Sequence, residues 1–115
     1  MTYREALLRA IDGWKTDPIP DEWLFERFRS GTIGAMSAPE AFEAIGETIE
    51  ILLLEVDEST SIEILQSILN LAIQSDTTEI PEMLLRQKDD LQLKFACFDD
   101  YANHKLQELF GYYRI

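Results

Sequence analysis

The chain has 115 residues, and its 22 acidic and 10 basic side chains give a formal net charge of −12 with the single histidine neutral. This length predicts one domain over residues 1–115, and the 46 % hydrophobic content is typical of a folded protein rather than a disordered one. Because phosphate groups are bound by clustered Lys and Arg, the charge balance argues against a nucleic-acid partner.

Nothing in the sequence indicates export or a membrane. The N-terminal stretch is charged and lacks the apolar segment of ~7–15 residues that a signal peptide carries. The longest aliphatic run, residues 51–54, is far shorter than the ~20 residues that cross a bilayer. Cys97 is the single cysteine and cannot form an internal disulfide. We therefore expect a cytoplasmic protein that binds no membrane.

The first quarter of the chain predicts two short helices. Residues 3–14 carry apolar side chains at helical spacing, namely Leu7, Leu8, Ile11 and Trp14. Residues 16–20 contain two prolines and end this helix. A second helix is expected from residue 21 to about 28, followed by a flexible connection over residues 30–37, which contain two glycines.

The middle of the chain predicts an antiparallel helix pair. Ser37 and Glu40 fit a capping box, and Pro39 suits the first turn of a helix that should reach about Val56. Its apolar face comprises Ala41, Phe42, Ile45, Ile49, Leu52, Leu53 and Val56. A fourth helix, residues 62–74, is apolar over more than half of its circumference, Ile73 included, so it should be the most buried.

From about residue 82 the pattern stays helical nearly to the end, with a bend expected near residues 87–89. Its apolar stripe comprises Leu91, Phe95, Phe98, Ala102, Leu106, Leu109 and Tyr113. No stretch alternates with a period of two, so the predicted fold class is all-α, a bundle of about five helices. Two Ala/Ile-Pro-Glu helix starts lie 42 residues apart, a spacing seen in HEAT-type repeats, so stacked helical hairpins are the alternative to a simple bundle.

The negative charge is concentrated in the middle third. Residues 39–82 hold eleven acids and no base, whereas residues 1–38 sum to −1 and residues 83–115 to 0. Like charges three or four residues apart on a helix repel by roughly 0.2–0.5 kcal/mol per pair. The region is therefore either a solvated face or a surface that attracts a basic protein partner.

Two apolar residues, Ile51 and Leu54, fall among the glutamates of the third helix. An apolar pair ringed by acids resembles an interface hot spot with a charged rim, and the alternative is that another segment covers it. The candidate partner-binding residues are Glu47, Glu50, Ile51, Leu54, Glu55, Asp57, Glu58, Glu79 and Glu82.

No motif predicts catalysis, a metal site or a cofactor. Cys97, Asp100 and His104 lie on one side of the expected last helix, but a structural zinc site needs four ligands. Two helical turns also separate Cys97 from His104 by ~10 Å, too far for a thiol–imidazole pair. We expect no enzyme.

The segment Asp76-Thr77-Thr78-Glu79-Ile80-Pro81 follows one apolar helix and opens another. It resembles a turn in the α-helical, HEAT-like immunity proteins of bacterial polymorphic toxin loci. The resemblance implies an inhibitor that binds and blocks a cognate toxin, often a basic nuclease, and it assigns no interface residue. The alternative is a helical adaptor or homo-oligomeric subunit whose last helix packs on a copy through residues such as Leu106 and Tyr113.

Overall fold

Six α-helices and one π-helical turn make up the computed structural model, which describes residues 1–19 and 21–115. They are α1 (Tyr3–Thr16), α2 (Leu24–Phe28), η1 (Arg29–Ile33), α3 (Ala38–Leu54), α4 (Glu58–Gln74), α5 (Glu82–Phe95) and α6 (Asp100–Tyr113). No β-strand occurs among the described residues. The all-α class is confirmed, and the number of helices is six rather than five.

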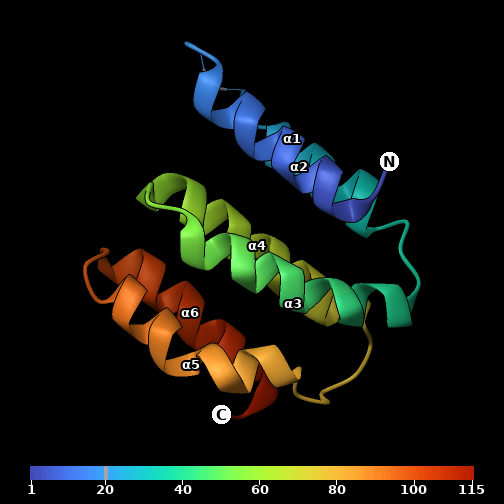
Figure 1. Ribbon diagram of the computed structural model, residues 1–115, viewed down its shortest axis with the longest axis vertical. Helices are drawn as coiled ribbons and strands as arrows, with labels where there is room; N and C mark the ends of the chain where they lie inside the picture. The colour runs from blue at the N-terminus through green and yellow to red at the C-terminus, as the bar shows by residue number, and fades with distance from the viewer. Residues whose placement is uncertain (20) are drawn as a thin grey trace.

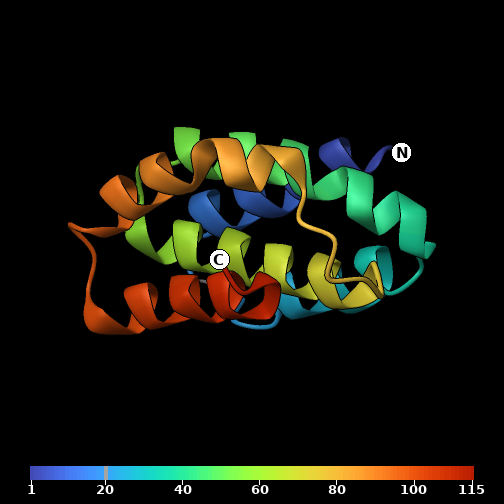
Figure 2. The same ribbon diagram turned by 90° about the horizontal axis from the view of Figure 1, so that it is seen from below.

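The helices form three antiparallel pairs, α1 with α2–η1, α3 with α4, and α5 with α6, which stack side by side (Figure 1). Helices α1, α3 and α5 lie in one layer and α2, α4 and α6 in the other (Figure 2). The turns within the pairs lie at one end of the molecule, which we name the turn end, and the linkers between pairs lie at the other (Figure 1).

Helix α4 is at the centre of the fold, as its apolar circumference predicts. It packs against α3, α6, η1 and α1, and it has more buried residues than any other described helix. One residue departs from the prediction, because Ile73 is 66 % exposed on the outer side of α4. Leu8 of α1 and Val56 are likewise exposed rather than part of a buried face.

The first pair differs from the predicted boundaries. The expected break at residues 16–20 is present from residue 17, and its last residue, Pro20, lies outside the described residues. The second helix begins at residue 24, and its last turn continues as η1 instead of a flexible connection. Position 34, directly after this wide turn, requires glycine, because a Cβ atom there would lie 2.4 Å from the carbonyl oxygen of Ser30.

The start of α3 is the predicted capping box. The backbone N–H of Glu40 donates to Ser37 Oγ (3.3 Å), and the backbone N–H of Ser37 donates to Glu40 Oε1 (3.0 Å). Helix α3 ends at Leu54, two residues before the predicted end, because the side chain of Glu55 accepts the backbone N–H groups of Val56 and Asp57.

Replacing Ser37 with alanine should lower the free energy of unfolding by about 1 kcal/mol, since the first turn of α3 loses its hydroxyl acceptor. Urea denaturation followed by circular dichroism measures the change. Ser59→Ala is the control, because Ser59 is exposed and caps no helix. An equal loss in both variants would contradict the stabilising role of the cap.

The predicted last helix is two helices. Residues 96–99 form a turn, at which Asp99 Oδ1 accepts the backbone N–H of Ala102 (2.9 Å) and caps α6. The amide of Asn103 donates to the carbonyl oxygens of Phe95 (2.7 Å) and Asp99 (3.0 Å), which holds the turn closed. Helix α5 is unbroken through residues 87–89, and the chain turns at residues 96–99 instead.

Candidate protein-binding surface

The acids of residues 39–82 divide into paired and unpaired groups. Lys15 Nζ lies 2.7 Å from Glu55 Oε2, and Arg29 Nη1 lies 2.9 Å from Glu63 Oε2. Both cations come from the first pair of helices, outside the lysine-free region. A third ion pair lies within α5 and joins Glu82 to Arg86.

A row of unpaired carboxylates remains on α3. Glu43, Glu47, Glu50 and Leu54 follow one another at helical spacing on the side of α3 that points away from α4, and we name them the α3 stripe. In the described part of the chain no ion pair reaches these three glutamates. Glu43 and Glu50 are exposed, and Glu47 is half-buried.

The expected apolar pair in this region is half correct. Leu54 is 81 % exposed at the end of the α3 stripe, whereas Ile51 is only 8 % exposed and belongs to the core. Ile51 is covered because α3 packs against neighbours on three sides, namely α1, α4 and α5. The second exposed apolar residue here is Val56, which is 87 % exposed in the turn after α3. The helical periodicity had predicted a buried position for Val56.

Glu55 is part of the interior rather than of the surface. Its carboxylate binds Lys15 and the backbone N–H groups of Val56 (3.0 Å) and Asp57 (2.9 Å), while Lys94 donates to its carbonyl oxygen. Burial raises the pKa of this carboxyl, but Lys15 and the two N–H groups together outweigh burial and hold the pKa below its usual value. Glu55 therefore joins the three helix pairs and is not available to a partner.

Two further predicted residues, Asp57 and Glu58, have structural partners and still face solvent at the turn end. Asp57 caps α4, because its Oδ2 accepts hydrogen bonds from the hydroxyl and the backbone N–H of Thr60, and these bonds hold the pKa of Asp57 below its usual value. Glu58 Oε2 accepts the backbone N–H of Asp99 (3.3 Å). Asp57, Glu58 and Asp99 line one hollow together with residues of α4.

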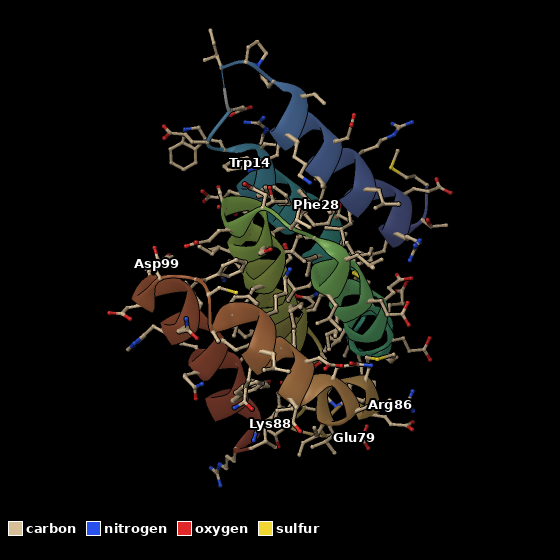
Figure 3. All side chains as sticks on the ribbon, turned by 60° about the vertical axis from the view of Figure 1, so that its left-hand side comes forward. Trp14, Phe28, Glu79, Arg86, Lys88 and Asp99 are labelled. Carbon is tan, nitrogen blue, oxygen red and sulfur yellow. The ribbon has the colours of Figure 1, made fainter. Side chains whose placement is uncertain are left out.

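The remaining predicted residues, Glu79 and Glu82, are exposed at the opposite end of the molecule. Figure 3 shows Glu79 far from Asp99, which marks the turn between α5 and α6. The nine predicted residues therefore do not form one surface. The structure brings Leu54, Asp57 and Glu58 to the turn end and leaves Glu47 and Glu50 along α3.

No sequence pattern marks a second hollow, which lies on the other layer between α2–η1, α4 and α6. Its charged lining residues include Arg29 and Lys105, and it also exposes the ring of Tyr101. These residues come from distant parts of the chain and share no sequence spacing, so no local pattern could have marked them.

The cysteine and the histidine are not on one helix face. Cys97 lies in the turn before α6, exposed, with Sγ 3.3 Å from the carbonyl oxygen of Lys94, whereas His104 is on α6. Among residues 1–19 and 21–115, no three His, Cys, Asp or Glu side chains are grouped as metal ligands. None of the described helices combines the length and apolarity that crossing a bilayer requires.

Comparison of the chain with protein-family models, with curated proteins and with solved structures returned no match.

Proposed function

We propose that the protein is a non-catalytic binding protein that inhibits a basic protein partner by covering part of its surface. The α3 stripe is the observation that carries this proposal: three glutamates without a cationic partner lead along one helix to the exposed Leu54. Such a row of like charges destabilises α3 by roughly 0.2–0.5 kcal/mol per neighbouring pair, which interleaved lysines would have avoided. A positively charged partner would offset the repulsion between the glutamates of the α3 stripe, which accounts for a row of like charges on one helix.

Charge and apolar area have different roles in this proposal. The carboxylates of the α3 stripe raise the rate of encounter with a basic protein, and this effect weakens with salt. Leu54 and Val56 supply the apolar contact that an interface needs for affinity, since exposed charges alone contribute little.

We further propose that the three stacked pairs are HEAT-like hairpins of an immunity protein of a toxin system. Asp57 and Asp99 both cap the second helix of a pair, 42 residues apart (99 − 57), which supports a repeated unit. The alternative, a helical adaptor or homo-oligomeric subunit, needs a contact other than Leu106 and Tyr113, because both side chains are buried within their own chain.

The test is binding to the protein encoded by the neighbouring gene, because toxin and inhibitor genes of the proposed class lie together. The variant Glu43→Lys, Glu47→Lys, Glu50→Lys should lower the association rate about tenfold at low salt, with a smaller difference at high salt. Stopped-flow fluorescence measures the rate, and circular dichroism confirms that the variant is folded.

The matched control is Asp12→Lys, Glu22→Lys, Asp90→Lys, which changes the net charge equally at exposed positions outside residues 39–82. It should affect the rate much less, because the reversed charges are spread over the molecule. Wild-type protein that does not bind the neighbouring product, or equal rates for both triple variants, would contradict the proposed function.

A further inference from the structure

Two adjacent hollows lie along the outer side of α4. One hollow, at the turn end, is lined by Asp57, Glu58, Asp99 and the first turns of α4, and a second is lined by η1, α4 and α6. The two share the lining residues Ile62 and Glu63, and we name them together the α4 groove. Its floor from residue 59 to residue 70 is about 16 Å long, enough for roughly five extended residues.

The walls of the α4 groove are fixed to its floor. From one wall, Arg29 Nη1 donates to the carboxylate (2.9 Å) and to the carbonyl oxygen (3.3 Å) of Glu63. From the other, Lys105 Nζ donates to Gln66 Oε1 (2.8 Å), whose amide donates to Asn70 Oδ1 (2.9 Å). Because these contacts order the side chains before binding, a ligand in the groove does not have to supply that ordering free energy.

The charge left available in the groove is negative and lies at the turn end. Arg29 is neutralised by Glu63, and Lys105, which donates to Gln66, lies 3.8 Å from the carboxylate of Glu108. Asp57, Glu58 and Asp99 have no ion pair in the described part of the chain, and each is held in place by a backbone N–H bound to one carboxylate oxygen. The groove thus presents fixed carboxylates without an ion pair at the turn end. Along its middle, Arg29 and Lys105 lie beside carboxylates, and Glu26 adds one further acid.

The groove also offers apolar contact next to these carboxylates. Ile62 lies on the floor, in both hollows, and Tyr101 forms part of the α6 wall with its side chain 60 % exposed. Tyrosine is among the residues that contribute most at protein interfaces, because its ring adds area at a small conformational-entropy cost. Charge complementarity therefore favours a polypeptide that carries a cationic side chain near an apolar one.

We propose that the α4 groove binds an extended Lys- or Arg-bearing segment of the protein partner. The cation meets Asp57, Glu58 and Asp99, and an apolar side chain packs on Ile62 and Tyr101. This inference rests on the proposed function and assigns it a second contact surface. The α3 stripe and the groove are on opposite layers, so a partner that touches both must pass around the turn end, where Leu54 and Val56 are exposed.

The probe is a displayed library of random 12-residue peptides selected on the wild-type protein. The enriched peptides should combine Lys or Arg with an apolar residue, and fluorescence anisotropy then gives their affinity. The groove variant Glu58→Gln, Tyr101→Ala should bind them about tenfold more weakly, the loss expected for a removed charge contact and a truncated ring. Glu58→Gln keeps an oxygen that can accept the Asp99 N–H.

The matched control is Asp90→Asn, Leu85→Ala, which makes similar changes at exposed positions of α5, on the other layer and outside the α3 stripe. It should leave peptide affinity within twofold. Peptides that lack basic residues, or equal affinities for the groove and control variants, would overturn the groove as a binding site.

The groove variant and the α3 triple reversal, both measured with the neighbouring gene product, separate this inference from the proposed function. If the partner binds, and the α3 triple reversal slows it while Glu58→Gln, Tyr101→Ala leaves its affinity unchanged, the groove proposal is wrong and the proposed function stands. If basic peptides bind the groove and the neighbouring product does not bind at all, the proposed function is wrong and the groove remains a peptide site.

Discussion

Phe95→Ala is expected to lower the free energy of unfolding by about 4 kcal/mol, the range of large-to-small substitutions that leave a cavity. Phe95 is fully buried at the end of α5, and its ring meets the ring of Phe98 edge-on at a centroid distance of 5.1 Å. The substitution leaves a cavity next to the turn that connects α5 to α6. Because domains of this size are stable by only about 5–15 kcal/mol, the variant should be close to unfolding.

Urea denaturation at low temperature measures this loss. The control is Leu93→Ala on the same helix, which should change stability by less than about 0.5 kcal/mol because Leu93 is 71 % exposed. Hydrogen exchange should also show faster opening of α6 in Phe95→Ala than in the control. If both variants were equally stable, Phe95 would not join α5 to α6 as the structure indicates.

Glu55→Ala is expected to cost about 2 kcal/mol of stability. The loss comes mainly from the backbone N–H groups of Val56 and Asp57, which lose their acceptor at the end of α3. The ion pair adds less, since the Lys15 side chain is 39 % exposed and remains hydrated when its partner is removed. Glu50→Ala is the control, and relief of repulsion on α3 should leave it as stable as the wild type or slightly more so.

The stability difference between wild type and Glu55→Gln should depend on pH in one direction. The folded protein holds the pKa of Glu55 below its ordinary value of 4.5, so the ionised form is the one that folding favours. The difference is therefore complete above pH 4.5 and shrinks as the pH falls through the lower folded pKa. Urea titrations of both proteins between pH 3 and 7 measure it, and a difference that grew toward low pH would contradict the contacts of Glu55.

The role of Glu55 changes how charge reversals in this protein must be designed. Reversing Glu47, Glu50 and Glu55 together, the obvious choice from the sequence, would place a lysine beside Lys15 in the interior. Lost binding would then reflect lost folding. Replacing Glu55 by Glu43 in the set confines the changes to the α3 stripe, where none of the three glutamates has an ion pair among the described residues.

The helices with local signals could be predicted well. Ser37, Pro39 and Glu40 placed the start of α3, and the apolar circumference of α4 placed it at the centre of the fold. The turn between α5 and α6 could not be predicted, because residues 96–99 contain neither glycine nor proline and the apolar stripe continues across them. Asp99 was the local signal for a helix start, since its side chain caps α6. The hydrogen bond from Asn103 to the carbonyl oxygen of Phe95 forms only once the chain has turned, so it could not be read from the sequence.

Local pattern by itself determined the helical class and the concentration of eleven acids in residues 39–82. The tertiary structure alone decided which of those acids remain free. Lys15 and Arg29 neutralise Glu55 and Glu63 across separations of 40 and 34 residues (55 − 15 and 63 − 29). An ion pair between residues so far apart in sequence produces no periodic pattern, because it depends on how the helix pairs stack and not on spacing along one helix. The same stacking buried Ile51, exposed Leu54 and assembled the α4 groove from residues of all three helix pairs.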